Sequence, residues 1–87
     1  MRVEVRYWAA LRAVAGCKEE TVEVADETTL DDLVQSLIEE HDAPGFTRII
    51  EGCSVLIDGR SVARAARAET VVAKGQRVEF LPPFAGG

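Results

Sequence analysis

The last residues of the chain favour chemistry at a free chain end. Segment 81–87 reads Leu-Pro-Pro-Phe-Ala-Gly-Gly. Gly86 and Gly87 surround the terminal carboxylate with bare backbone, which can enter a narrow channel, and the diproline stiffens the start of the tail. No residue after it carries a charged side chain, so burying the tail costs little beyond the carboxylate itself. We therefore predict a tail that enters a partner's active site, with Gly87 as the reacting residue and Phe84, Ala85 and Gly86 threading the channel.

Other residues suited to chemistry are few. Cys17 and Cys53 lie far apart and match no CxxC or Cys/His spacing, so neither a disulfide framework nor a zinc site is expected. His41 is the single histidine and has no second histidine with which to share a metal or relay a proton. The cysteines are suited to packing; a sulfur-relay role is the less favoured alternative. The sequence thus shows no catalytic cluster of its own.

Length and composition place the chain among small globular proteins. It has 87 residues, of which 47% are hydrophobic and 29% charged, enough for one domain. A net charge of -5 makes nucleic acid an unexpected partner, because phosphate binding needs a basic face. No apolar run approaches the roughly 18 residues of a membrane span, and charge alternates along residues 1–6, unlike a signal peptide. A cytoplasmic protein without membrane contact is the expectation.

The charge is unevenly distributed along the chain. Residues 18–42 hold ten acids and one base, Lys18, whereas the remainder holds nine bases and five acids. Arg60, Arg64 and Arg67, together with segment 74–77, predict a basic lobe in the second half. A solvated face is the simpler interpretation of the acidic stretch; steering toward a basic partner is the alternative.

Hydrophobic periodicity predicts the elements that position the tail. Strict alternation over residues 2–8 and a second extended run over 20–24 predict a hairpin with a long, partly helical connection. An apolar stripe over residues 30–38, with a threonine N-cap and acids in the first turn, predicts the main helix. We expect Pro44-Gly45 to end that helix, and residues 46–50 to form a short helical turn.

Patterns in the second half of the sequence predict short strands. Residues 54–57 lead into an Asp-Gly turn, and residues 77–81 form a last strand that the diproline stops. Two short strands could flank the intervening loop. This order indicates an α+β domain whose most economical form is a β-grasp (ubiquitin-like) mixed sheet with one main helix across one face. Its first and last strands would be parallel central neighbours. We predict the domain over residues 1–81 and a flexible tail over 82–87.

Several stretches resemble the MoaD/ThiS sulfur-carrier family, and most closely its MoaD branch. They are residues 7–16 (YWAALRAVAG), 29–33 (TLDDL), 55–59 (VLIDG) and 78–87 (VEFLPPFAGG). The ending is the most specific of them, and the resemblance spans essentially the whole chain. One departure is Lys74-Gly75-Gln76-Arg77, where the family commonly has an acidic turn.

The resemblance implies a β-grasp fold and chemistry at Gly87. A MoeB-like partner would adenylate the terminal carboxylate with ATP, and a sulfur donor would convert it to a thiocarboxylate. A MoaE-like large subunit of molybdopterin synthase would then use the sulfur in molybdenum cofactor biosynthesis. The chain would be a non-catalytic, sulfur-donating subunit with no cofactor of its own.

Other roles stay open. A ThiS-like carrier for thiamine, or a carrier for cysteine synthesis, would use the same thiocarboxylate. A ubiquitin-like modifier would use the same adenylate and attach Gly87 to lysines. A β-grasp binding module with an inert tail is the third class.

Strand alternation also predicts a docking surface. It places Trp8 opposite in phase to the inward residues of the first strand, and leaves Leu81 outward on the last. If these strands are neighbours, Trp8 and Leu81 form an apolar patch beside the root of the tail, extended by Leu56 and Phe84. An exposed tryptophan in such a patch is a typical interface anchor; a tryptophan half covered at the sheet edge is the alternative.

Overall fold

The computed structural model describes residues 1–83, which fold around a five-stranded sheet. The strands are β1 (Arg2–Tyr7), β2 (Glu19–Glu23), β3 (Ser54–Ile57), β4 (Arg60–Val62) and β5 (Arg77–Leu81), and their order across the sheet is β2-β1-β5-β3-β4. β1 and β5 pair in parallel at the centre, and the other pairs are antiparallel. The predicted mixed sheet with parallel first and last strands is confirmed.

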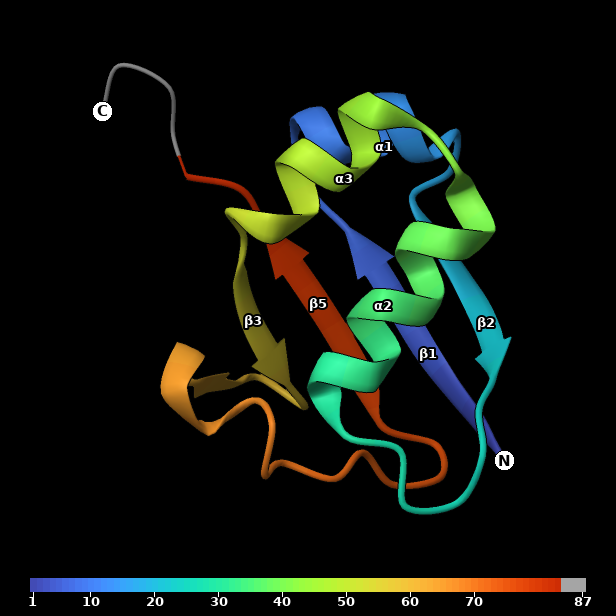
Figure 1. Cartoon of the computed structure of the whole chain (residues 1–87), viewed down its shortest axis with the longest axis vertical. Coiled ribbons are helices and arrows are strands. Elements are labelled where there is room, and N and C mark those ends of the chain that lie inside the picture. The colour runs from blue at the N-terminus through green and yellow to red at the C-terminus, as the bar shows by residue number, and fades with distance from the viewer. Residues whose placement is uncertain (84–87) are drawn as a thin grey trace.

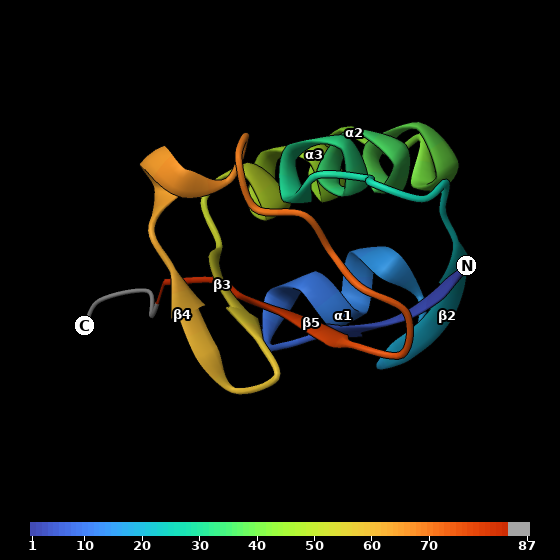
Figure 2. The ribbon, with the colours of Figure 1, turned by 90° about the horizontal axis from the view of Figure 1, so that it is seen from below.

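The helices lie on one side of the sheet and leave its other face uncovered (Figures 1 and 2). They are α1 (Ala10–Ala15), α2 (Leu30–His41) and α3 (Pro44–Glu51), with a 3₁₀ turn, η1 (Arg64–Ala66), after β4. α1 and α3 confirm the two short helical segments. Of the two short strands expected in the loop before β5, β4 is present, and Val71 forms a single bridge with Thr29.

The start of α2 follows from its capping residues. Thr29 accepts a hydrogen bond from the backbone of Asp32, and the Asp32 carboxylate accepts one from the backbone of Thr29, forming a capping box. Asp42 ends the helix in the left-handed conformation. Pro44 then occupies the first turn of α3, where its missing N–H is no loss. α2 therefore ends before Pro44, the latest end that the sequence allows, and Pro44 begins the next helix.

The core lies between the sheet and the helices. Tyr7 sits at its centre: its ring packs edge-on against Phe46 at 5.7 Å and stacks on Phe80 at 6.4 Å between centroids. The residues that share this core are Val3, Val5, Tyr7, Leu11, Leu30, Leu33, Leu37, Phe46, Ile50, Cys53, Val55, Ile57, Val72, Val78 and Phe80. The odd-numbered residues of β1 supply one layer of it, as their alternation predicts.

The predicted basic lobe is only partly present. Arg60 and Arg64 are exposed, and Arg64 donates to the Glu51 carbonyl. Arg67 instead is 7% exposed and donates from Nη2 to the Cys53 carbonyl at 2.8 Å. Burial is the main cause that lowers the pKa of Arg67. Arg67 is therefore not part of an exposed basic lobe, and it ties the loop after β4 to the start of β3.

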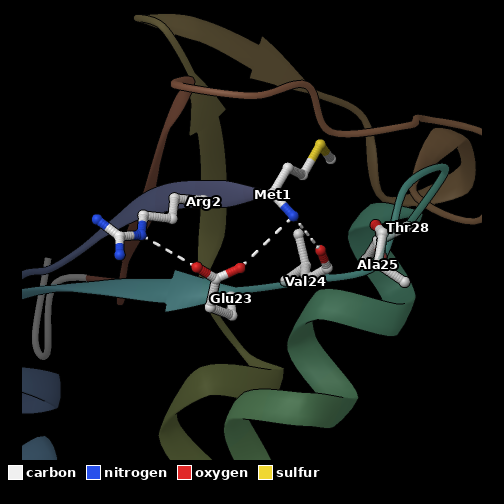
Figure 3. Close-up of polar contacts among 6 residues, drawn as sticks. All are labelled: Met1, Arg2, Glu23, Val24, Ala25 and Thr28. Carbon is white, nitrogen blue, oxygen red and sulfur yellow. Dashed lines mark hydrogen bonds and ion pairs between the residues drawn. The ribbon is translucent and has the colours of Figure 1, made fainter.

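A polar network joins the start of β1 to the end of β2 (Figure 3). The Met1 amino group donates to the Val24 carbonyl at 2.8 Å and lies 3.5 Å from the Glu23 carboxylate. Arg2 donates from Nε to the same carboxylate at 3.0 Å. The hydrogen bond from Arg2 is the main cause that lowers the pKa of Glu23. This network engages the Glu23 side chain on the uncovered face.

Candidate functional site

The root of the tail lies beside Trp8. Because β1 and β5 run in parallel with Tyr7 opposite Phe80, both strands finish at the same end of the sheet. The Trp8 backbone N–H donates to the Phe80 carbonyl at 3.2 Å, and β5 ends one residue later, at Leu81. The predicted proximity of Trp8 to the tail's root is confirmed. Phe84, Ala85, Gly86 and Gly87, on which the predicted chemistry rests, lie outside the described residues.

Three of the predicted interface residues share the uncovered face of the sheet. Trp8, Leu56 and Leu81 are each half-buried. In the strand register Leu56 lies opposite Glu79, and Leu81 lies opposite Ser54. Glu79 therefore stands between the apolar residues, and its carboxylate accepts a hydrogen bond from Trp8 Nε1 at 2.9 Å. The surface is an amphipathic patch, less purely apolar than the sequence predicts.

Two arginines complete the surroundings of Trp8. The guanidinium carbons of Arg6 and Arg12 each lie 4.6 Å from the centroid of its ring, within the range of cation–π attraction. Arg12 also donates from Nε to the Tyr7 carbonyl at 2.7 Å. Sequence reasoning missed this arrangement, although the period of two placed Arg6 on the Trp8 face. Arg12 is brought back by α1, which begins directly after Ala9.

Replacing Trp8 tests whether this patch docks a partner. We expect Trp8→Ala to weaken binding to a partner docked on this patch at least tenfold, because buried tryptophans commonly anchor interfaces. The free energy of unfolding should fall by only about 1 kcal/mol, the net value of one hydrogen bond. Calorimetric titration and urea unfolding measure the two quantities. Unchanged partner affinity in a folded variant would remove the patch from the interface.

The two cysteines occupy environments that disfavour reaction. Cys53 is buried in the core, and its thiol donates to the Ile49 carbonyl at 3.3 Å. Burial raises the pKa of Cys53 to about 11. Cys17 is half-buried, and burial followed by the charge of Glu20 raises its pKa as well. These features support packing roles over a sulfur relay.

Alkylation should distinguish the two thiols. At pH 8 we expect iodoacetamide to modify Cys17 slowly, and Cys53 only after unfolding, because Cys53 combines full burial with a raised pKa. Peptide mapping by mass spectrometry with and without urea would check the order. Rapid modification of Cys53 in the folded chain would contradict it.

A second polar cluster lies on the helix side of the sheet. Glu20 Oε2 accepts a hydrogen bond from Tyr7 at 2.6 Å and lies 2.7 Å from His41 Nε2. Burial is the main cause that raises the pKa of Tyr7, and Glu20 adds to it. The His41 ring stacks on Phe46 at 4.3 Å between centroids. Sequence analysis missed this cluster, which joins the end of α2 to β1 and β2 as a structural tie.

Residues 1–83 contain neither a metal-binding cluster nor a membrane-spanning helix. No group of three or more His, Cys, Asp or Glu side chains is arranged to hold a metal ion within that range. Among the same residues, no helix has the length and apolar character to cross a membrane.

Comparison with known proteins places the chain in a family. The model of the ThiS family matches residues 5–87. Small archaeal modifier protein 3 of Haloferax volcanii is 34% identical over 92 residues, covering all of both chains. The molybdopterin synthase sulfur carrier subunit of Chlamydomonas reinhardtii is 29% identical over 87 residues, again covering both completely.

Solved structures share the fold. SAMP1 of Haloferax volcanii superposes with a TM-score of 0.81 at 25% identity, over all of both chains. One chain of the complex of subunits 1 and 2 of the Helicobacter pylori molybdopterin-converting factor superposes with a TM-score of 0.69 at 20% identity, over all of both chains. This second likeness concerns the fold alone. These matches agree with the strand order and the placement of α2 described above. The chain therefore belongs to the ThiS/MoaD family of small β-grasp sulfur carriers.

Proposed function

We propose that this chain carries sulfur as a thiocarboxylate on Gly87 and donates it as the small subunit of a molybdopterin synthase. The observation that carries the proposal is the Gly-Gly end, which follows a central strand and a diproline with two residues, Phe84 and Ala85, between. The match of the ThiS family model over residues 5–87 supports it, and so does the molybdopterin synthase relative, which matches along its entire length.

The chemistry requires activation of a poor electrophile. A MoeB-like enzyme would join the Gly87 carboxylate to the AMP portion of ATP and release pyrophosphate. Sulfide, or its equivalent from a donor protein, would then attack the carbonyl carbon and displace AMP. The chain supplies the carboxylate and a surface for docking, whereas the partners supply the catalytic groups.

The described geometry suits delivery of the tail to a partner. β5 occupies the centre of the sheet and is held on both sides, by β1 and by β3. The tail therefore starts from a rigid point. By the strand register, the patch formed by Trp8, Leu56 and Leu81 lies on the face of the sheet opposite to the buried side chains. A MoaE-like subunit seated on this patch would lie next to the point where the tail leaves the domain.

A second candidate is protein modification. The 34% identical relative is named a modifier protein, and a modifier would begin with the same adenylate. The two functions differ in the nucleophile: sulfide in the carrier and a lysine amine in the modifier. Only the product distinguishes them.

The test is the intact mass of the chain after incubation with ATP, a MoeB-like enzyme and sulfide. We expect a gain equal to replacing one oxygen with one sulfur, and its loss on subsequent incubation with a MoaE-like subunit and the dithiolene precursor. A mass gain without transfer of sulfur to that precursor would support the carrier chemistry but refute the synthase role. A lysine adduct would favour the modifier, and no gain at all would refute both.

A further inference from the structure

Among residues 1–83, β2 is an outermost strand, and one of its sides is unpaired. The Tyr7 N–H donates to the Lys18 carbonyl, and the Val24 N–H donates to the Met1 carbonyl, both at 2.8 Å. The even-numbered residues of segment 18–24 therefore direct their backbone N–H and C=O groups toward β1. By the alternation of an antiparallel pair, Thr21 and Glu23 direct theirs away from the sheet. Such an edge can pair with a further strand.

A groove of about 320 Å³ runs between this strand and α2. Its lining is mixed: Val22 and Val24 are half-buried there, whereas Leu33 and Leu37 of α2 lie fully buried beneath it. On the helix side, Ser36 and Glu40 also line it. The strand edge thus offers backbone hydrogen bonds, and the groove beside it offers the half-buried side chains of Val22 and Val24 as apolar contacts for alternate side chains of an added strand.

The charge around the groove selects the kind of segment that fits. No Lys or Arg lines the groove within residues 1–83, whereas Glu20 and Glu40 do; Glu23 also borders it, but its side chain lies on the uncovered face with Arg2. Glu20 and Glu23 are engaged by His41 and by Arg2, and Glu40 is exposed. β2 and α2 both belong to the stretch 18–42, with its ten acids. A second copy of this chain would bring like charges together, and a basic segment would complement them.

We propose that the β2 edge and its groove bind an extended basic segment of a partner protein, which adds to the sheet as a sixth strand. Its apolar side chains would enter the groove, and its Lys or Arg side chains would face Glu40 and the neighbouring acids. This surface lies at the edge of the sheet opposite β4 (Figure 1). It is separate from the Trp8 patch, which lies on the uncovered face. It is independent of the sulfur chemistry, and a partner could occupy it while the tail is engaged elsewhere.

A peptide of alternating lysine and valine with blocked ends, titrated into the full chain and followed by NMR amide shifts, tests the proposal. We expect shifts concentrated at residues 19–24 and on the groove side of α2, and none with a glutamate–valine peptide. Shifts centred on β4, shifts spread over the whole surface, or no shifts at millimolar peptide would each overturn it. Dimerisation through β2, seen by sedimentation, would assign the edge to a second copy and overturn it too.

Two matched pairs of variants separate backbone pairing from charge. Thr21→Pro removes one outward N–H without breaking the bonds to β1, and we expect it to weaken peptide binding about tenfold. Ser61→Pro removes the corresponding outward donor on β4 and should leave affinity within about twofold. Glu40→Lys should weaken binding about threefold, whereas Glu39→Lys, with equal net charge but outside the groove lining, should not. Equal effects within the Glu40/Glu39 pair would overturn the assignment even if a proline variant fails to fold.

Discussion

One serine added after Gly87 is expected to abolish sulfur loading while leaving the domain folded. An extra residue moves the terminal carboxylate by about 3.5 Å, and a misplacement of about 1 Å can already cost a hundredfold in rate. It also adds a side chain where Gly86 and Gly87 have none. The intact mass after incubation with ATP, a MoeB-like enzyme and sulfide measures loading, and thermal unfolding measures the fold.

The control for this experiment is recovery of the native end. Proteolytic removal of the added serine should restore loading, because the reacting group is then again the carboxylate of Gly87. Loading of the extended chain at the normal rate would place the reacting group elsewhere in the molecule. The same result would also remove the modifier function, which requires the same adenylate.

Patterns with a clear period predicted most of the fold. The stripe from Leu30 to Ile38 gave α2, and the alternation from Arg2 to Trp8 gave β1. Both patterns identify the side chains that become buried on folding, and the same side chains face the core of the folded chain. The diproline marked the end of β5 for a different reason, since proline has no N–H for a strand ladder.

Contacts between side chains distant in sequence were not predictable in this way. The sequence groups Arg67 with Arg60 and Arg64 in a basic lobe, yet the carbonyl of Cys53, a residue 14 positions earlier, accepts its hydrogen bond in a buried position. Trp8 was placed on the correct face, but its bond to Glu79 spans 71 positions. No local pattern encodes such pairs, because each depends on the completed packing of the sheet.

The Tyr7–Glu20–His41 cluster illustrates the same limit at a buried site. Each residue comes from a different element, and each alone has an ordinary sequence context. Alternation correctly placed Tyr7 inward, and a buried tyrosine usually finds a partner for its hydroxyl. The identity of that partner follows only from the pairing of β1 with β2.

Phe80→Ala is expected to cause the largest loss of stability. Phe80 is fully buried on β5, stacks on Tyr7, and lies opposite Tyr7 and Val55 on the two neighbouring strands. Truncation of such a ring costs about 3–5 kcal/mol, a large share of the roughly 5–15 kcal/mol that stabilises a small domain. Urea unfolding monitored by circular dichroism measures the change, and a loss below about 1 kcal/mol would contradict the central position of this ring.

Phe80→Leu and Trp8→Ala are the matched controls. Phe80→Leu keeps much of the apolar volume and should cost at most about 1.5 kcal/mol. Trp8 lies at the same end of the sheet as Phe80 but on its uncovered face, where its ring is half-buried. Trp8→Ala should therefore weaken partner binding with little loss in the free energy of unfolding. Phe80→Ala should mainly lower the free energy of unfolding. A reversal of these two effects would mean that the sheet's two faces have been assigned the wrong roles.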